Sequence, residues 1–157
     1  MLEPHWLDEI QRETFVRASP GTEAAYPAAY RMTGTQIEAY LRSGCNAVVA
    51  TTRPNGRPHA VPTGVTVHEH AAWLPVSGGA VRSAHLTAHP WASVVLIEGS
   101  GVDHRLVILE GDAELVTGPL PEVAATNRGG RDMSWASHWI RLRPRKVFSF
   151  TGAGTGD

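Results

Sequence analysis

The sequence has only one cysteine, Cys45, only one lysine, Lys146, and no long run of apolar residues. A single cysteine excludes an intramolecular disulfide and every zinc motif that needs several cysteines. Because no apolar run is long enough for a membrane-spanning helix, and the first residues lack the apolar segment of a signal peptide, we expect a cytoplasmic protein with no membrane partner.

The chain also lacks an excess of either charge. Its 14 basic and 15 acidic side chains give a net charge of −1, whereas proteins that bind nucleic acids through phosphate contacts are usually basic. We therefore expect no nucleic-acid partner, and any bound anion must be held by a local site. With 157 residues, of which 42% are hydrophobic, the chain has enough apolar surface for one globular domain.

Helical patterns come first along the chain. Residues 5–18 have the apolar spacing of a short helix, and Ser19–Arg31 shows no period. A second helix is expected around Ile37, because Thr33 is a typical N-cap residue and the apolar spacing after it is helical.

Short β-type runs separated by turn signals follow from Asn46. The pair Asn55-Gly56 predicts a tight hairpin, with a return strand over about His59–Val67, and Pro144 interrupts the last strand. Six strands with a few short helices predict a mainly β protein, an antiparallel barrel with helical decoration.

The segment Val76–Leu86 is the best candidate for a binding site. A strand runs into Gly78-Gly79 and then into a helix expected over Ala80–His89. Free backbone N–H groups and the positive end of a helix can hold an anion there, and Arg82 adds a fixed charge. A plain strand-to-helix connection with a surface arginine would show the same pattern.

Other polar residues carry weaker signals. His85 and His89 are four apart, a spacing that can chelate a metal, but no third ligand is identifiable, so we predict no metal site. Trp139 and Arg141 could cover an aromatic ligand, and core packing explains them nearly as well. No residue is assigned as a catalytic acid or base.

The motifs together resemble the pyridoxamine 5′-phosphate oxidase-like FMN-binding split-barrel family. The resemblance covers residues 36–150 and rests on the hairpin RPNGRPHAVP, on a basic residue three before His85-Leu86, and on the strand VILEGDAELV. It implies a six-stranded antiparallel Greek-key split β-barrel that forms a homodimer, with flavin sites at the subunit interface. The chain would then comprise an N-terminal helix and arm at 1–34, the flavin-binding domain at 35–150 and a disordered tail at 151–157.

The resemblance also implies which residues bind the cofactor. Arg82 matches the basic residue that binds the cofactor phosphate. The other implied positions are Val61, Pro62 and Thr63 along the isoalloxazine, Val76 and Ser77 along the ribityl chain and phosphate, and Trp139 and Arg141 near the place where the partner subunit closes the pocket.

Departures from the family pattern narrow the expected function. Relatives that oxidise pyridoxamine phosphate carry an arginine where this chain has Val61, and a C-terminal Arg-x-His-Asp-Arg motif that is absent here. We therefore expect an FMN-dependent oxidoreductase that acts on an unidentified small molecule. Two alternatives stay open: an enzyme that uses the deazaflavin F420, with Arg53 and Arg57 beside its anionic tail, and a non-catalytic protein that binds flavin or haem.

Overall fold

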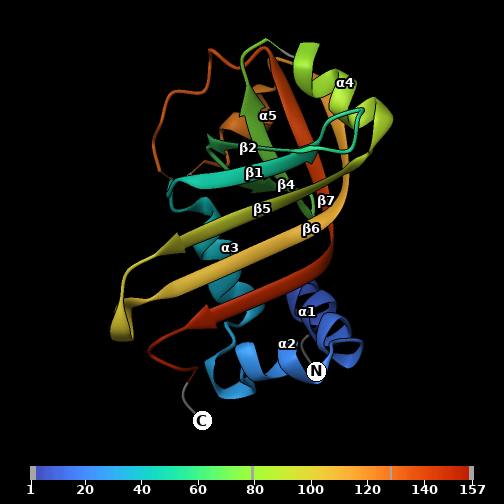
Figure 1. Ribbon diagram of the computed structural model, residues 1–157. Helices are drawn as coiled ribbons and strands as arrows, with labels where there is room; N and C mark the ends of the chain where they lie inside the picture. The colour runs from blue at the N-terminus through green and yellow to red at the C-terminus, as the bar shows by residue number, and fades with distance from the viewer. Residues whose placement is uncertain (1–2, 79, 128, 156–157) are drawn as a thin grey trace.

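A computed structural model describes residues 3–78, 80–127 and 129–155. Its strands form one seven-stranded antiparallel sheet in the order β2-β1-β5-β6-β7-β4-β3 (Figure 1). The strands are β1 (Ala47–Thr52), β2 (Pro58–Thr63), β3 (Thr66–His68), β4 (Ala71–Val76), β5 (Trp91–Glu98), β6 (Arg105–Thr117) and β7 (His138–Thr151). The helices are α1 (Trp6–Val16), α2 (Pro20–Ala25), α3 (Gly34–Arg42), α4 (Ala80–Ala88) and α5 (Pro121–Ala124), with 3₁₀ turns η1 (Ala28–Tyr30) and η2 (Gly101–Asp103).

The expectation of a mainly β, antiparallel protein is confirmed, but the expected six-stranded barrel is wrong in strand number and in closure. The return strand expected over His59–Val67 breaks at Gly64 into β2, which pairs with β1, and β3, which pairs with β4. A Cβ on Gly64 would lie 3.6 Å from Met133 Cε and 3.7 Å from Pro75 Cγ, so the chain passes close to β4 as it changes partner. β2 and β3 remain the two edges of the sheet, which is therefore not closed.

One face of the sheet holds the main core. Leu74, Leu96 and Ile140 are fully buried there, and α3 adds Ile37 and Leu41. In Figure 1 this helix lies behind the long strands β5 and β6. Each fully buried aliphatic side chain of this kind stabilises the fold by about 1.5–3 kcal/mol, so α3 is part of the domain core.

The N-terminal segment covers the edge of β7 after Leu142, where β4 no longer pairs with it. Thr14 Oγ1 on α1 accepts a hydrogen bond from Val147 N at 3.1 Å, and Met32 N donates to Ser149 Oγ at 2.9 Å. These bonds satisfy a strand edge that would otherwise be open to pairing. The stretch Ser19–Arg31, which has no period, contains α2 and η1.

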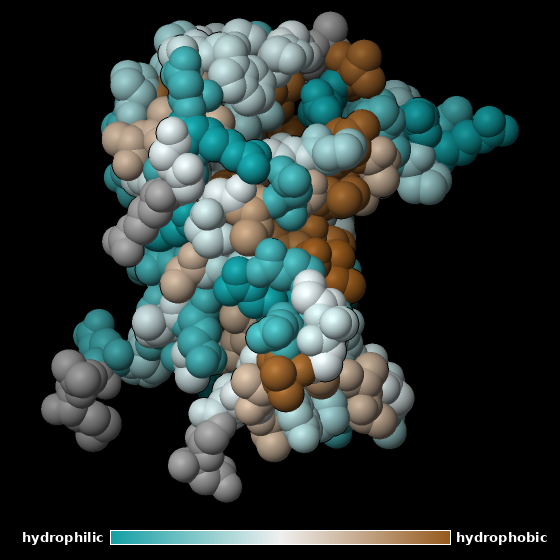
Figure 2. All heavy atoms as spheres, turned by 90° about the vertical axis from the view of Figure 1, so that its left-hand side faces the viewer, coloured by the Kyte–Doolittle hydropathy of each residue, from teal (hydrophilic) through white to brown (hydrophobic). Residues whose placement is uncertain are grey.

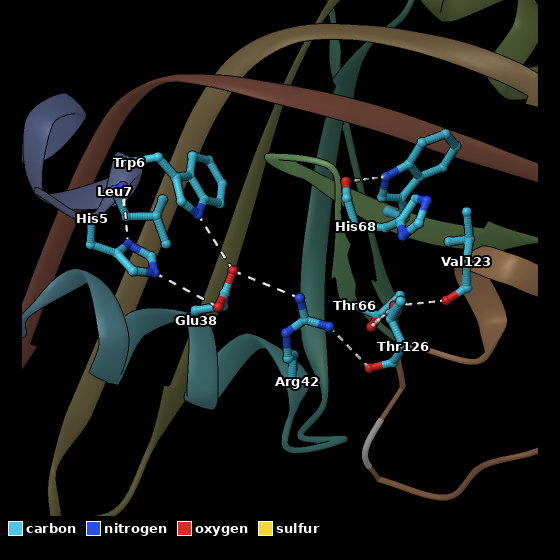
Figure 3. A network of polar contacts seen from close by, with 10 residues as sticks. His5, Trp6, Leu7, Glu38, Arg42, Thr66, His68, Val123 and Thr126 are labelled. Atoms are coloured by element: carbon cyan, nitrogen blue, oxygen red, sulfur yellow. Dashed lines mark hydrogen bonds and ion pairs between the residues drawn. The ribbon is translucent and has the colours of Figure 1, made fainter. Parts of the chain in front are cut away.

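A polar network ties α1, α3 and the chain after α5 together (Figure 3). Glu38 accepts a hydrogen bond from Trp6 Nε1 at 3.4 Å, lies 3.7 Å from Nε2 of His5 and forms an ion pair with Arg42. Arg42 also donates to the carbonyl of Thr126 at 3.3 Å.

The helix start at Gly34 agrees with the expected N-cap, because Thr33 and Gln36 form a capping box.

The last residues return to the N-terminal arm. Gly152 N donates to His104 O, and Thr155 N donates to Ala29 O. The rest of the tail that we expected to be disordered, residues 156–157, lies outside the described residues. None of the described helices has the length and apolar character that crossing a membrane requires.

Candidate functional site

The strand-to-helix turn singled out in the sequence lies at one end of the sheet, where β4 leads into α4 (Figure 1). Gly78 has a φ of +69°, and a Cβ placed on it would meet nothing within 4 Å, so the space above the turn is open. Gly79, part of the expected turn, lies outside the described residues. Arg82, in the first turn of α4, is partly exposed and makes no ion pair or side-chain hydrogen bond with any described residue. An open turn, a helix start and a free guanidinium are the components of an anion site.

Two residues that the sequence reasoning missed border this turn. Gly78 N donates to Ser137 Oγ at 3.3 Å, and Ser137 Oγ lies 3.0 Å from Nδ1 of His138. His138 pairs with Val76 in the β4–β7 register. These contacts join segments about sixty positions apart in the sequence, so no local pattern could have indicated them.

The end of β2 approaches the same region. The approach of Gly64 to Pro75 brings Thr63 close to the last residues of β4. Pro62 is exposed, whereas Val61 is half-buried and packs against the main core. The structure thus brings Thr63, at the end of β2, toward the end of β4 that carries the turn.

Three further basic side chains, those of His85, His59 and Arg53, contact one another in a row that begins on α4, the helix of Arg82. His85 is buried and hydrogen-bonds through Nδ1 to Thr51 Oγ1 at 2.9 Å, and its ring lies 5.1 Å from that of His59. Nη2 of Arg53 contacts Nδ1 of His59 at 3.0 Å. Burial, followed by the positive charges of His59, Arg53 and Arg82, lowers the pKa of His85, which favours its neutral form.

Trp139 and Arg141 lie on the other face of β4 and β7. Trp139 pairs with Pro75 and Arg141 pairs with Trp73. Val76, the next residue of β4 after Pro75, points to the opposite face, toward the main core. Trp139 is 1% exposed within a second apolar cluster, and its Nε1 has no hydrogen-bond partner among the described residues. Arg141 forms an ion pair with Glu114. Within one chain, therefore, these two side chains are not next to Arg82.

A separate polar cluster lies at the opposite end of the sheet, where β5 turns into β6. Cys45 donates to Glu98 Oε2 at 3.2 Å, and Arg105 forms an ion pair with the same carboxylate. The bond from Cys45, and then Arg105, lowers the pKa of Glu98. Burial, and then the charge of Glu98, raises the pKa of Tyr40 to about 12. The Arg105 guanidinium also lies over the Tyr40 ring, 3.9 Å from its centroid, so these side chains hold one another in place.

Metal binding gains no support from this geometry. Across residues 3–78, 80–127 and 129–155, no three His, Cys, Asp or Glu side chains are placed to hold a metal ion. His85 hydrogen-bonds through Nδ1 to Thr51, and a pair formed with His89 would still lack a third ligand among the described residues. Basic side chains and backbone amides of this kind are groups that can hold an anion.

The fold is an open antiparallel sheet with a candidate anion site at the end of β4, and comparison with known proteins gives its family. Residues 34–154 match the family described as pyridoxamine 5′-phosphate oxidase, and the chain belongs to that family. A comparison with curated proteins finds no match.

Solved structures show the same fold. The conserved hypothetical protein Rv2991 from Mycobacterium tuberculosis is 23% identical with a TM-score of 0.69, over 81% of this chain and 89% of that chain. The FAD binding protein from Mycobacterium smegmatis is 17% identical with a TM-score of 0.54, over 77% and 98%. HutZ, the haem storage protein from Vibrio cholerae, is 17% identical with a TM-score of 0.58, over 76% and 96%. At these identities the likeness concerns the fold.

Proposed function

We propose that this protein is an FMN-binding oxidoreductase, which passes a hydride through bound flavin to or from a small molecule. The observation that carries the proposal is the open turn at Gly78, with Arg82 free on the first turn of α4 and the end of β2 close by. A phosphate monoester fits this set of donors, because the helix start and the guanidinium both favour a negative charge. Family membership and a solved relative that binds FAD support a flavin.

The donor set also indicates how the work is divided between cofactor and protein. Bound flavin would supply the two-electron chemistry, and this chain would supply binding and orientation. Arg82 and the backbone at Ser77 and Gly78 would hold the phosphate. Val61, Pro62 and Thr63 would lie along the ring, with the half-buried Thr63 hydroxyl already donating to the carbonyl of Gly64 at 2.9 Å.

The outer face of the sheet supports a homodimer. Val48 and Ile97 are 43% and 60% exposed, and the register places apolar partners beside them. We call this surface the open apolar face; it consists of Val48, Pro62, Val95, Ile97, Leu106 and Ile108. In Figure 2 hydrophobic atoms gather toward the right-hand side, which corresponds to the front of the sheet in Figure 1.

The occupant of the open apolar face would be a second copy of the chain. Apolar surface of this kind marks an interaction site, and the face includes Pro62 from the strand that would line the ring. A dimer formed here would bring the partner close to the cofactor, and we propose the partly exposed Arg141 of that partner for closing the pocket. Trp139, which is 1% exposed within its own chain, is not available for this role. The neighbouring part of the sheet is covered by the arm, where Tyr26 and Tyr30 pack on Phe148 and Phe150.

One observation favours F420 as a second candidate cofactor. Arg53 and His59 lie close enough to His85 for their charges to act on it together with that of Arg82, and neither Arg53 nor Arg82 forms an ion pair with an acid in the described part of the chain. A cofactor with a second anionic group beyond its phosphate would neutralise this cluster. FMN has no such second group, so Arg53 and His59 would remain without an anionic partner from the cofactor.

Absorption spectroscopy of the purified protein after incubation with each cofactor, followed by gel filtration, tests the proposal. FMN should stay bound and give a two-band flavin spectrum, and NAD(P)H or another hydride donor should bleach it. A single deazaflavin band would favour F420, and a Soret band after haem incubation would favour the binding protein without catalysis. A protein that stays colourless with all three contradicts the proposal and its alternatives.

A further inference from the structure

The anion site has a third side, formed by Ser137 and His138 at the start of β7. His138 lies opposite Val76 in the register, one strand away from the turn. Ser137 Oγ accepts the hydrogen bond from Gly78 N at 3.3 Å. Through these two residues β7 contacts both the end of β4 and the turn before α4.

The Ser137 hydroxyl can support two protonation states of His138. Its oxygen lies 3.0 Å from His138 Nδ1 and 3.5 Å from the carbonyl of Val76. When the imidazole is neutral with its proton on Nε2, the hydroxyl donates to Nδ1. When the imidazole is a cation, Nδ1–H donates to the hydroxyl oxygen, and the hydroxyl turns to the Val76 carbonyl. In both states the same atoms remain hydrogen-bonded, so the ring keeps its position.

The remaining nitrogen of the ring is free to bind a ligand. Nε2 of His138 makes no hydrogen bond with the residues that the structure describes, and the side chain is half-buried, not enclosed. It carries a proton in both states described above, so it can donate to an anion in both. Arg82 on α4 and His138 on β7 then lie at the same end of the sheet as the Gly78 turn.

We infer that His138 is a ligand of the phosphate group of the bound cofactor and that Ser137 positions it. This inference rests on the proposed function, because it assigns a further residue to the same site. Ser137 is a positioning residue, which orients the imidazole and holds the Gly78 turn at the same time.

Binding of FMN and riboflavin, which differ by the phosphate, tests this assignment. Dissociation constants are measured by quenching of flavin fluorescence for the wild type, His138→Gln and Ser137→Ala. A lost charge-assisted contact should weaken FMN binding about tenfold in His138→Gln and leave riboflavin binding unchanged. Ser137→Ala should show a smaller loss of the same kind. His104→Gln, at the far end of the sheet, is the control and should bind both flavins like the wild type.

Each outcome separates the inference from the proposed function. If the wild type binds neither flavin, the proposed function and this inference both fail. If the wild type binds FMN and His138→Gln binds it equally well, or loses FMN and riboflavin affinity to the same extent, His138 is not a phosphate ligand, while the proposed function stands. If His138→Gln does not fold, Ser137→Ala decides, and equal changes for both flavins in that variant overturn the inference.

Discussion

Replacing Arg82 with alanine should weaken FMN binding without destabilising the fold. Arg82 lies on the first turn of α4 beside the open Gly78 turn, and within the described residues its guanidinium makes no ion pair or hydrogen bond that folding would lose. A partly exposed side chain without such contacts changes the free energy of unfolding by no more than about 0.5 kcal/mol when it is replaced. A loss of affinity would therefore report on the ligand contact.

The size of the effect follows from the bond that is removed. A hydrogen bond to a charged group contributes about 1.5–3 kcal/mol, and each 1.4 kcal/mol is about a factor of ten in the dissociation constant. Because Arg82 is partly exposed, water screens part of this interaction, so we expect a loss of about 10- to 100-fold. Arg82→Lys keeps the charge and loses the planar fork, and its affinity should fall between the wild type and Arg82→Ala.

Isothermal titration calorimetry with FMN measures this series directly. Arg12→Ala serves as the matched control, because Arg12 is an exposed arginine on α1, away from the turn. The control should bind FMN with wild-type affinity. If Arg82→Ala also binds FMN as tightly as the wild type, Arg82 does not hold the phosphate and the site is misassigned.

Two further predictions concern assembly and acid stability. Ile97→Glu puts a charge on the open apolar face, so the dimer should dissociate in analytical ultracentrifugation and FMN affinity should fall with it; a dimeric variant would exclude this face as the interface. Glu98 has a lowered pKa in the folded state, so its contribution is present above the ordinary glutamate pKa and is lost as the pH falls through the lowered one. Urea unfolding at pH 7 and pH 4 should show a smaller acid loss for Glu98→Gln than for the wild type, and equal losses would contradict this.

Local patterns accounted for much of the fold. The Asn55-Gly56 pair and the N-cap at Thr33 act through neighbouring residues, and each lies where the sequence indicated it. The expected interruption at Pro144 is wrong, because β7 runs unbroken from His138 to Thr151 and shows only a register shift against β6 there. The break at Gly64 was missed, because β2 pairs with β1 and β3 pairs with β4, and strand partners are a tertiary property. Missing that break produced six strands in place of seven.

The site, like the fold, could be predicted where its residues are neighbours in the sequence and not where they meet through strand pairing. Arg82 could be found because the strand, the turn and the helix that place it are contiguous in the sequence. Ser137 and His138 could not, since they meet Gly78 only through the pairing of β4 with β7. The burial of Trp139 depends on which face of β7 it occupies, and that is decided by the register with β4.

Native mass spectrometry of the purified protein mixed with FMN tests the central claim most directly, because it reports assembly and cofactor binding in one measurement. We predict a species with twice the 16.9 kDa chain mass and two bound FMN molecules. At the same FMN concentration, Arg82→Ala should give a species without bound FMN. A wild-type protein that carries no FMN at any concentration up to millimolar would contradict the account.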